Sequence, residues 1–296
     1  MEDVKKSAVP YLFIMPAIVL LIVFSIIPIV ISLVISFTDL DLRGLANWSS
    51  IRFNAGNNFA VLLDDGVFLQ SILNTFFYVI IGVPLVILCA LTVALLLNFA
   101  TSKLFSVFRV VYYMPSITNI VAIAVVWGFL YNQDYGLFNT LLGYVGIGDV
   151  PWLEDPLIAK LSLILLAVWK GIGINMIIFL AALQAIPSRY YEAADIDGAS
   201  RWQKLFYITI PSLRYATFFV TVTTLIGWLQ FFEEPFVMTE GGPLDGTLSM
   251  ALFIYQEGFQ YSQFGYAAAA SFVLFIFIII MTLIQFKFRQ SEDEVR

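Results

Sequence analysis

The stretch YEAADIDGASRWQKLFYITIPSLR, residues Tyr191 to Arg214, is a polar segment in a very apolar chain. Long apolar runs lie on both sides of it. A plain connector between two hydrophobic segments could be much shorter and less regular in its pattern of residues. The stretch therefore indicates a built element that joins two membrane-spanning helices.

The composition places the whole chain in a membrane. Of the 296 residues, 60% are hydrophobic and only 12% are charged, which is far outside the range of soluble domains. Histidine is absent and Cys89 is the single cysteine, which excludes a disulfide framework, a Cys/His metal site and imidazole catalysis. The net charge of −6 argues against a nucleic-acid partner, because binding to phosphates needs a basic surface.

Six apolar runs are long enough to span a bilayer, which takes about 20 residues per helix. They predict an all-α membrane protein with six transmembrane helices. The first run is too long for a signal peptide and no cleavage motif follows it, so we expect a retained span. The predicted spans are approximately Tyr11 to Phe37, Gln70 to Asn98, Val107 to Tyr131, Ala159 to Leu183, Pro211 to Phe232 and Gly265 to Phe286.

The distribution of lysine and arginine predicts the orientation, since these residues are retained on the cytoplasmic side. One side of the predicted topology has only Arg43, Arg52 and Lys160. We therefore expect both termini and the polar stretch to be cytoplasmic. The cations on that side are Lys5, Lys6, Lys103, Arg109, Arg189, Arg201, Lys204, Arg214, Lys287, Arg289 and Arg296.

The polar stretch is predicted to form two short helices with a bend between them. Ser188 is a candidate N-cap for a helix that runs to about Asp197. Gly198 suits the left-handed conformation that ends such a helix. Ser200 and Gln203 have the spacing of a capping box, so a second helix should begin at once. Pro211 can then lie in the first turn of the next span.

Two interpretations of this bent segment are open. It could lie on the lipid headgroups as an amphipathic connector, because Trp202, Leu205, Phe206 and Thr209 recur at helical spacing. Its first helix, however, is slim and carries carboxylates, which an anionic inner leaflet repels. A slim helix of this kind fits a groove on a protein. A cytoplasmic protein partner is therefore the favoured interpretation.

The segment resembles the EAA loop of ABC importer permeases. The matching residues are Glu192-Ala193-Ala194, Gly198 and the run from Ile208 to Pro211. Thr239-Glu240-Gly241-Gly242-Pro243 resembles the T-x-G-G-P segment of the carbohydrate-uptake branch, and the chain lacks the long outer insertion and extra N-terminal spans of the maltose-system first permease. Further segments similar to that branch are Tyr113-Met114-Pro115-Ser116, Asn132-Gln133-Asp134-Tyr135-Gly136, Trp169-Lys170-Gly171 and Leu183-Gln184-Ala185-Ile186-Pro187.

The resemblance implies a type I ABC importer permease fold for residues 1–296, as one transmembrane domain in a bacterial or archaeal cell membrane. The chain would then form half of a sugar pathway. The implied partners are a second homologous permease, an ATP-binding-cassette ATPase dimer that binds ATP and Mg, an extracytoplasmic solute-binding protein, membrane lipid and the sugar. Residues 188–210 would be the loop that couples to the ATPase, with Glu192, Ala193, Ala194, Asp195, Gly198 and Arg201 in contact with it.

Lys170 is the one charge well inside a predicted span. An intramembrane charge indicates either a functional site or a structural contact, here with a carboxylate or a carbonyl of a neighbouring helix. Gly171 and Gly173 beside it permit close helix approach. Ala167, Trp228 and Phe231 stand where the maltose permease has polar amides, so we expect a different mode of sugar binding. The aromatic rings of Trp228 and Phe231 either stack on sugar rings or pack against other side chains. The resemblance places the substrate pathway on Tyr112, Ser116, Ala167, Lys170, Gly171, Ile174, Thr224, Gly227, Trp228 and Phe231.

Several other readings are weaker. The run from Gly241 to Thr247 has the glycine spacing of a phosphate loop but lacks its lysine, so a turn is favoured and ATP hydrolysis is expected in a separate subunit.

Glu233 and Glu234 face a water-filled vestibule or are solvated carboxylates at the outer edge, the second being commoner. An ion-coupled secondary transporter is the main alternative, although neither an inverted repeat nor a mid-span carboxylate is evident. An intramembrane enzyme is a weaker interpretation still, because the sequence offers no nucleophile together with a base that could activate it.

Overall fold

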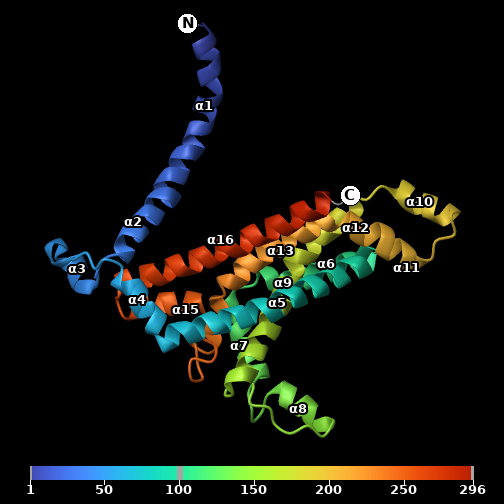
Figure 1. The fold of residues 1–296 in the computed structure, drawn as a ribbon. Helices are drawn as coiled ribbons and strands as arrows, with labels where there is room; N and C mark the ends of the chain where they lie inside the picture. Colours follow the sequence, from blue (N-terminus) through green and yellow to red (C-terminus); the bar gives the residue numbers. More distant parts are fainter. Residues whose placement is uncertain (1, 99–102, 295–296) are drawn as a thin grey trace. The chain divides into compact units, whose positions relative to one another are not determined.

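The structure is a computed structural model that describes residues 2–98 and 103–294. Within these ranges all regular secondary structure is helical, apart from one isolated antiparallel bridge between Thr38 and Phe53. Arg296 of the predicted cytoplasmic set lies outside the described residues. The α-helices, shown in Figure 1, are α1 Glu2–Leu21, α2 Ile27–Ser36, α3 Leu42–Ala46, α4 Asn57–Asp64, α5 Gly66–Asn98, α6 Lys103–Ile117, α7 Ile120–Leu130, α8 Leu137–Tyr144, α9 Pro156–Gln184, α10 Ser188–Ile196, α11 Arg201–Lys204, α12 Ile210–Ser212, α13 Arg214–Leu229, α14 Glu233–Met238, α15 Met250–Tyr255 and α16 Phe264–Glu294.

Short segments of other helix types connect several of these elements. Wide, π-helical turns cover Ile22–Ile26, Leu205–Thr209 and Gln256–Gln260, and a 3₁₀ turn covers Trp48–Ser50. The first of them joins α1 to α2 without a break. Together these elements make a chain with several helices long enough to cross a bilayer.

Five segments have the length and apolar composition of membrane spans. They are Phe13–Ser36, Gly66–Asn98, Pro156–Gln184, Arg214–Met238 and Phe264–Arg289. Their positions agree with five of the predicted spans to within a few residues, except that the span predicted over Pro211 to Phe232 continues through α14 to Met238. Pro211 itself lies in the first turn of α12, and α13 begins after it, at Arg214.

The segment predicted as a span from Val107 to Tyr131 is not one straight helix. The structure divides it into Val107–Ile117 and Ile120–Leu130, which meet at an angle of 100°. Asn119 ends the continuity, because its side-chain oxygen accepts a hydrogen bond from the Val121 backbone N–H at 2.8 Å and caps the second helix. The described residues thus contain five candidate spans, or six if the bent pair of α6 and α7 counts as one.

The chain forms two compact parts, Met1–Asp65 with Phe253–Ile276 and Gly66–Leu252 with Phe277–Arg296. In the first part, the Asn58 amide donates to the carbonyls of Ser36 and Thr38, at 2.9 and 2.8 Å. The Gly265 backbone N–H donates to the carbonyl of Leu40 at 2.9 Å. These bonds fasten α4 to the end of α2, and the start of α16 to the segment that follows α2. The single transmembrane domain inferred from the sequence stays a prediction.

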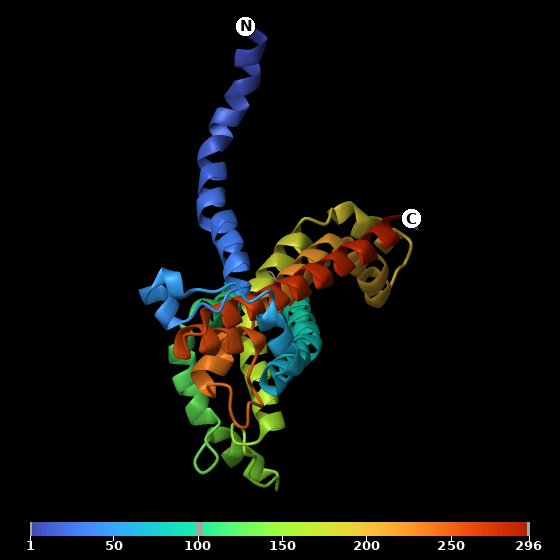
Figure 2. The same cartoon turned by 60° about the vertical axis from the view of Figure 1, so that its left-hand side comes forward.

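The core of the second part is built on α5, α9 and α13, which lie side by side in Figures 1 and 2. Ala90 and Ala94 on α5 are fully buried against Phe179 of α9 and Val220 of α13. Small side chains at this contact let the helix backbones approach closely, which is how helices associate in lipid. A rigid three-helix core therefore carries the residues described below.

The loop between α14 and α15 is fastened to α5. The Asn74 amide donates to the carbonyls of Asp245 and Leu248 at 2.8 and 2.9 Å, and the Tyr78 hydroxyl donates to the carbonyl of Thr247 at 3.0 Å. The segment from Gly241 to Thr247 forms turns here, as the sequence indicates. Backbone carbonyls that would otherwise be unpaired thus find partners on the neighbouring helix.

Candidate functional site

A cavity of about 690 Å³ lies in the second part, between α6, α9 and α13 and the segment that leads into α14. All of the residues predicted for the substrate pathway line this cavity except Tyr112. The adjacent Tyr113 lines the cavity instead. Contact of these residues with a substrate stays a prediction. The predicted residues on its wall are Ser116, Ala167, Lys170, Gly171, Ile174, Thr224, Gly227, Trp228 and Phe231.

Glycine at position 173 brings α6 against α9 beside this cavity. A methyl group there would overlap the carbonyl oxygen of Tyr112 and lie 2.7 Å from the Cα of Tyr113. The prediction that glycine permits close approach here is confirmed. The Ser116 hydroxyl, on the same turn of α6, donates a 2.5 Å hydrogen bond to the carbonyl of Lys170. The bent helix pair is thereby held on α9 at the level of Lys170.

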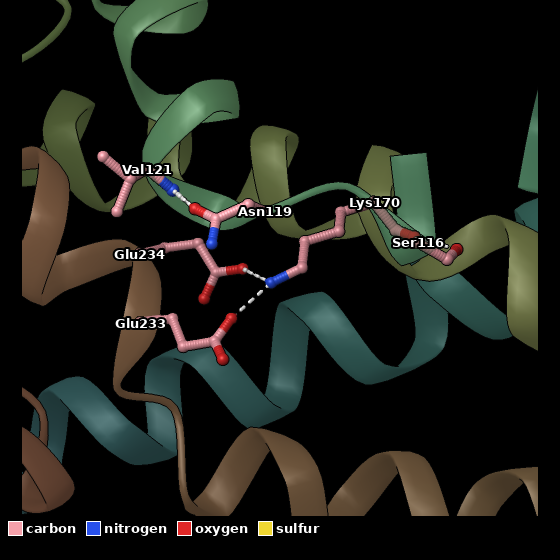
Figure 3. A network of polar contacts seen from close by, with 6 residues as sticks. All are labelled: Ser116, Asn119, Val121, Lys170, Glu233 and Glu234. Carbon is pink, nitrogen blue, oxygen red and sulfur yellow. Dashed lines mark hydrogen bonds and ion pairs between the residues drawn. The ribbon is translucent and has the colours of Figure 1, made fainter. Parts of the chain in front are cut away.

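Lys170 forms an ion triad with two carboxylates. Its Nζ lies 2.5 Å from Glu233 Oε2 and 3.2 Å from Glu234 Oε1. Figure 3 shows the lysine reaching from α9 towards the start of α14, below the loop that holds Asn119. The carboxylate partnership considered for Lys170 is thus present. A role of Lys170 in contact with substrate stays a prediction.

The two glutamates differ in exposure. The Glu234 side chain is 8% exposed, whereas that of Glu233 is 57% exposed, and both line the cavity. The interpretation of both as solvated carboxylates at an outer edge is wrong for Glu234, which is buried against Lys170. Sequence reasoning missed this triad because its members lie on different elements. Lys170 was the available signal, since a charge inside a span needs a counter-ion.

Trp228 and Phe231 form a stacked pair in the wall. Their ring centroids are 5.1 Å apart with the planes at 6°, and both side chains are buried. Phe231 also lies 4.7 Å from the ring of Tyr78, while the indole of Trp228 fills the space beside Gly82. These contacts favour packing as the role of the pair. Stacking of either ring on a sugar stays a prediction.

Adding a methyl group at Gly82 is expected to destabilise the protein. In Gly82→Ala the new Cβ would overlap the Trp228 ring, so the free energy of unfolding should fall by about 1–3 kcal/mol. Gly128→Ala is the matched control, because a Cβ at that helical glycine meets nothing within 4 Å. Thermal unfolding in detergent compares the two. Equal melting temperatures for Gly82→Ala and the native chain would contradict the close contact.

Uncharged polar groups also line the cavity. Asn175, which is buried, donates to the carbonyl of Gly171 at 2.9 Å, and the Thr224 hydroxyl lies 3.4 Å from its side-chain oxygen. Sequence reasoning did not single out Asn175. The wall therefore combines aromatic surface with hydroxyl, amide and carboxylate groups, which is the lining expected of a site for a polar small molecule.

The predicted coupling loop is two short helices with a bend. Gly198 has φ of +72°, in the left-handed region, and both hydrogen bonds of the Ser200/Gln203 capping box are present. These predictions are confirmed. The first helix begins one residue earlier than predicted, because Pro187 is its N-cap and Ser188 its first residue, and it ends at Ile196. The Ser188 side chain makes no capping bond, so that assignment is wrong.

Contacts between the two short helices hold the bend. Lys204 and Asp195 form an ion pair, and the Tyr191 hydroxyl lies 2.9 Å from that of Thr209. The predicted contact residues Glu192, Ala193, Asp195, Gly198 and Arg201 are exposed and Ala194 is half-buried. In Figures 1 and 2 the loop lies at the end of the second part opposite α8. Contact of this surface with an ATPase stays a prediction.

The apolar stripe expected on the second helix is only partly buried. Trp202 and Phe206 stack on each other with ring centroids 6.1 Å apart, yet both remain largely exposed. Thr209 is buried and Leu205 is half-buried. The loop thus presents an exposed aromatic pair beside the exposed EAA residues, which is a surface available to another molecule.

Comparison with known proteins gives consistent matches along the chain. Residues 56–291 match the family described as binding-protein-dependent transport system inner membrane component. The chain is 40% identical to the probable ABC transporter permease protein YesP of Bacillus subtilis (strain 168), over 96% of this chain and 91% of that protein. It is 37% identical to the lactose transport system permease protein LacF of Rhizobium radiobacter, over 93% and 92%.

A solved structure shares the fold. A chain from the crystal structure of a bacterial ABC transporter involved in the import of the acidic polysaccharide alginate superposes with a TM-score of 0.81. The match covers 98% of both chains at 24% sequence identity. At this identity the likeness shows the arrangement of the helices alone.

Proposed function

Because the chain belongs to the family of binding-protein-dependent transport system inner membrane components, we propose that it forms half of the membrane pathway of a carbohydrate importer driven by a separate ATPase. It is a multi-pass membrane protein with the type I ABC importer permease fold. Membership in this family removes the ion-coupled secondary transporter as an alternative. The relatives are permease subunits, which agrees with a non-catalytic chain.

One observation carries the carbohydrate assignment. A relative named for lactose transport matches nearly the whole chain at 37% identity. The cavity is consistent with a sugar, because it offers carboxylate, amide and hydroxyl groups between aromatic walls. Sugars are bound in proteins by such combinations of hydrogen bonds and apolar ring contacts. The substrate we propose is therefore a saccharide that crosses beside Lys170 and Gly171.

The partners follow from the family description. A binding-protein-dependent system requires an extracytoplasmic binding protein, and a half pathway requires a second permease. We place the bent loop, residues 188–210, on the cytoplasmic side, with both termini, because Lys and Arg collect there. Its exposed surface around Glu192, Gly198 and Arg201 docks on an ATPase dimer that holds ATP and Mg.

The geometry of the loop suits transmission of force. The Lys204–Asp195 pair and the Tyr191–Thr209 contact join its two helices, and Thr209 lies directly before α12 and α13. A push on α10 is therefore passed to α13, which forms one wall of the cavity. Closure of the ATPase would in this way bias a two-state change of the pathway between inward and outward openings.

Purification of the complex tests this function. A tag on this chain should retain a second permease of similar size and an ATP-binding-cassette subunit from native membranes. A panel of neutral and acidic oligosaccharides, each with the binding protein, should then include one that stimulates ATP hydrolysis. Recovery of this chain alone, active as a single polypeptide, would contradict the assignment and favour a carrier.

A further inference from the structure

The charged groups on the cavity wall do not balance. Among the described residues that line the cavity, the charged side chains are Lys170, Glu233 and Glu234. Their formal charges at neutral pH leave one negative charge. The remaining polar groups, from Ser116, Asn175, Thr224 and their neighbours, are uncharged. A solute in this cavity therefore meets one net negative charge, located at the triad of Lys170, Glu233 and Glu234.

The exposures of the triad locate that charge. Lys170 and Glu234 have side chains that are 20% and 8% exposed, so these two members of the triad are largely shielded from solvent. Glu233 is 57% exposed and engages Lys170 through Oε2. Its other oxygen, Oε1, has no protein donor among the residues that the structure describes. The triad as a whole carries the excess negative charge, and Glu233, its most exposed member, presents an acceptor oxygen to the cavity.

We propose that Glu233 contacts the substrate and selects uncharged saccharides over anionic ones. The proposal rests on the proposed function, since it concerns the passage of a sugar through this cavity. Glu233 Oε1 accepts hydrogen bonds from sugar hydroxyls, and bonds to an ionised acceptor are roughly twice as strong as neutral ones. Lys170 is a positioning residue, which fixes the Glu233 carboxylate through Oε2.

The same charge repels an anionic sugar. Two like charges about 6 Å apart in a partly hydrated cavity interact strongly enough to disfavour a uronate by on the order of tenfold. The cavity would therefore pass neutral sugars in preference to uronates. This selection is a property of the residues in this chain, because neither its helix arrangement nor its loop determines the charge of the wall.

Charged thiol reagents measure the proposed field without knowledge of the sugar. Thr223 lines the cavity and is exposed, so Thr223→Cys in a Cys89→Ala chain gives this chain one reporter thiol, and the complex without Thr223→Cys supplies the background labelling. In the full complex the cationic methanethiosulfonate MTSET should react faster than the anionic MTSES. Glu233→Gln should lower the ratio of the two rates about tenfold, and Glu154→Gln, a carboxylate away from the cavity, should leave it unchanged. An unchanged ratio in Glu233→Gln would overturn the proposal.

Uptake distinguishes substrate contact from a purely structural role. With the sugar that best stimulates ATP hydrolysis, Glu233→Gln should lower ATP-driven uptake at least about tenfold, as for loss of charge-assisted bonds. Its melting temperature should stay near the native value, because the Lys170–Glu234 pair remains. Normal uptake would overturn the contact, and a large fall in melting temperature would assign Glu233 a structural role instead.

The proposed function and the charge selection by Glu233 can be refuted independently. If no partner subunits are retained by the tagged chain, the proposed function is wrong whatever the thiol ratio. If the complex is complete and imports sugar but the ratio is insensitive to Glu233, the charge selection alone is wrong.

Discussion

Lys170→Met is expected to destabilise the protein by about 3–5 kcal/mol, because it leaves the buried Glu234 carboxylate without its counter-ion. The triad joins α9 to α14, so its loss also releases one wall of the cavity. Uptake by the complex should be abolished or nearly so. Thermal unfolding of the purified complex and ATP-driven uptake measure the two effects.

Two further variants make this result specific. Lys160→Met removes a lysine from the same helix whose ammonium group bonds the neutral Asn74 at 3.0 Å, so it should cost only about 1 kcal/mol. Adding Glu234→Gln to Lys170→Met removes the unpaired charge and should restore part of the lost stability. A Lys170→Met protein as stable as Lys160→Met would show that the triad does not hold the structure together.

Gly198→Leu is expected to uncouple ATP hydrolysis from uptake. The backbone at Gly198 has φ of +72°, where a residue with a branched side chain is strained by about 1–3 kcal/mol. No atom lies within 4 Å of a Cβ built there, so the effect acts through the bend between α10 and α11 rather than through a clash inside the chain. Sugar transported per ATP hydrolysed should fall about tenfold, as a change of 1.4 kcal/mol implies.

Gly198→Asn is the matched control for this prediction. Asparagine tolerates the left-handed region better than other residues that carry a side chain, so the bend and the coupling should largely survive. Transport stoichiometry in reconstituted complexes, measured at equal ATPase activity, compares the variants. A Gly198→Leu complex with native stoichiometry would count against the bend as the means of coupling.

The elements with strong local signals were predictable from the sequence. Apolar length located five spans to within a few residues, since the bilayer requires it. Glycine at 198 and the Ser200/Gln203 pair predicted the bend correctly, because both act through bonds within a few residues. The pathway residues that the resemblance predicted, apart from Tyr112, line one cavity in the structure. Their contacts with a substrate remain predictions.

Features set by tertiary structure were missed. The break at Asn119 is hidden in a hydropathy profile, because both halves of the bent pair are apolar. Asn119 between two apolar runs was the local signal for a new helix start. In the triad, Glu233 and Glu234 follow Lys170 by 63 and 64 positions in the sequence, so no helical or strand periodicity relates them to the lysine. Only the need of a membrane-embedded lysine for a counter-ion indicates that such a pair exists.

The central claim is that this chain is a passive half of a pathway whose energy comes from a partner ATPase. Transport into liposomes tests it most directly, with the purified chain alone compared with the chain reconstituted together with its second permease, ATPase and binding protein. We predict uptake of labelled sugar only in the complete complex and only with ATP inside the compartment that the ATPase faces. Sugar transport by the chain alone, with no nucleotide-binding subunit present, would contradict the account.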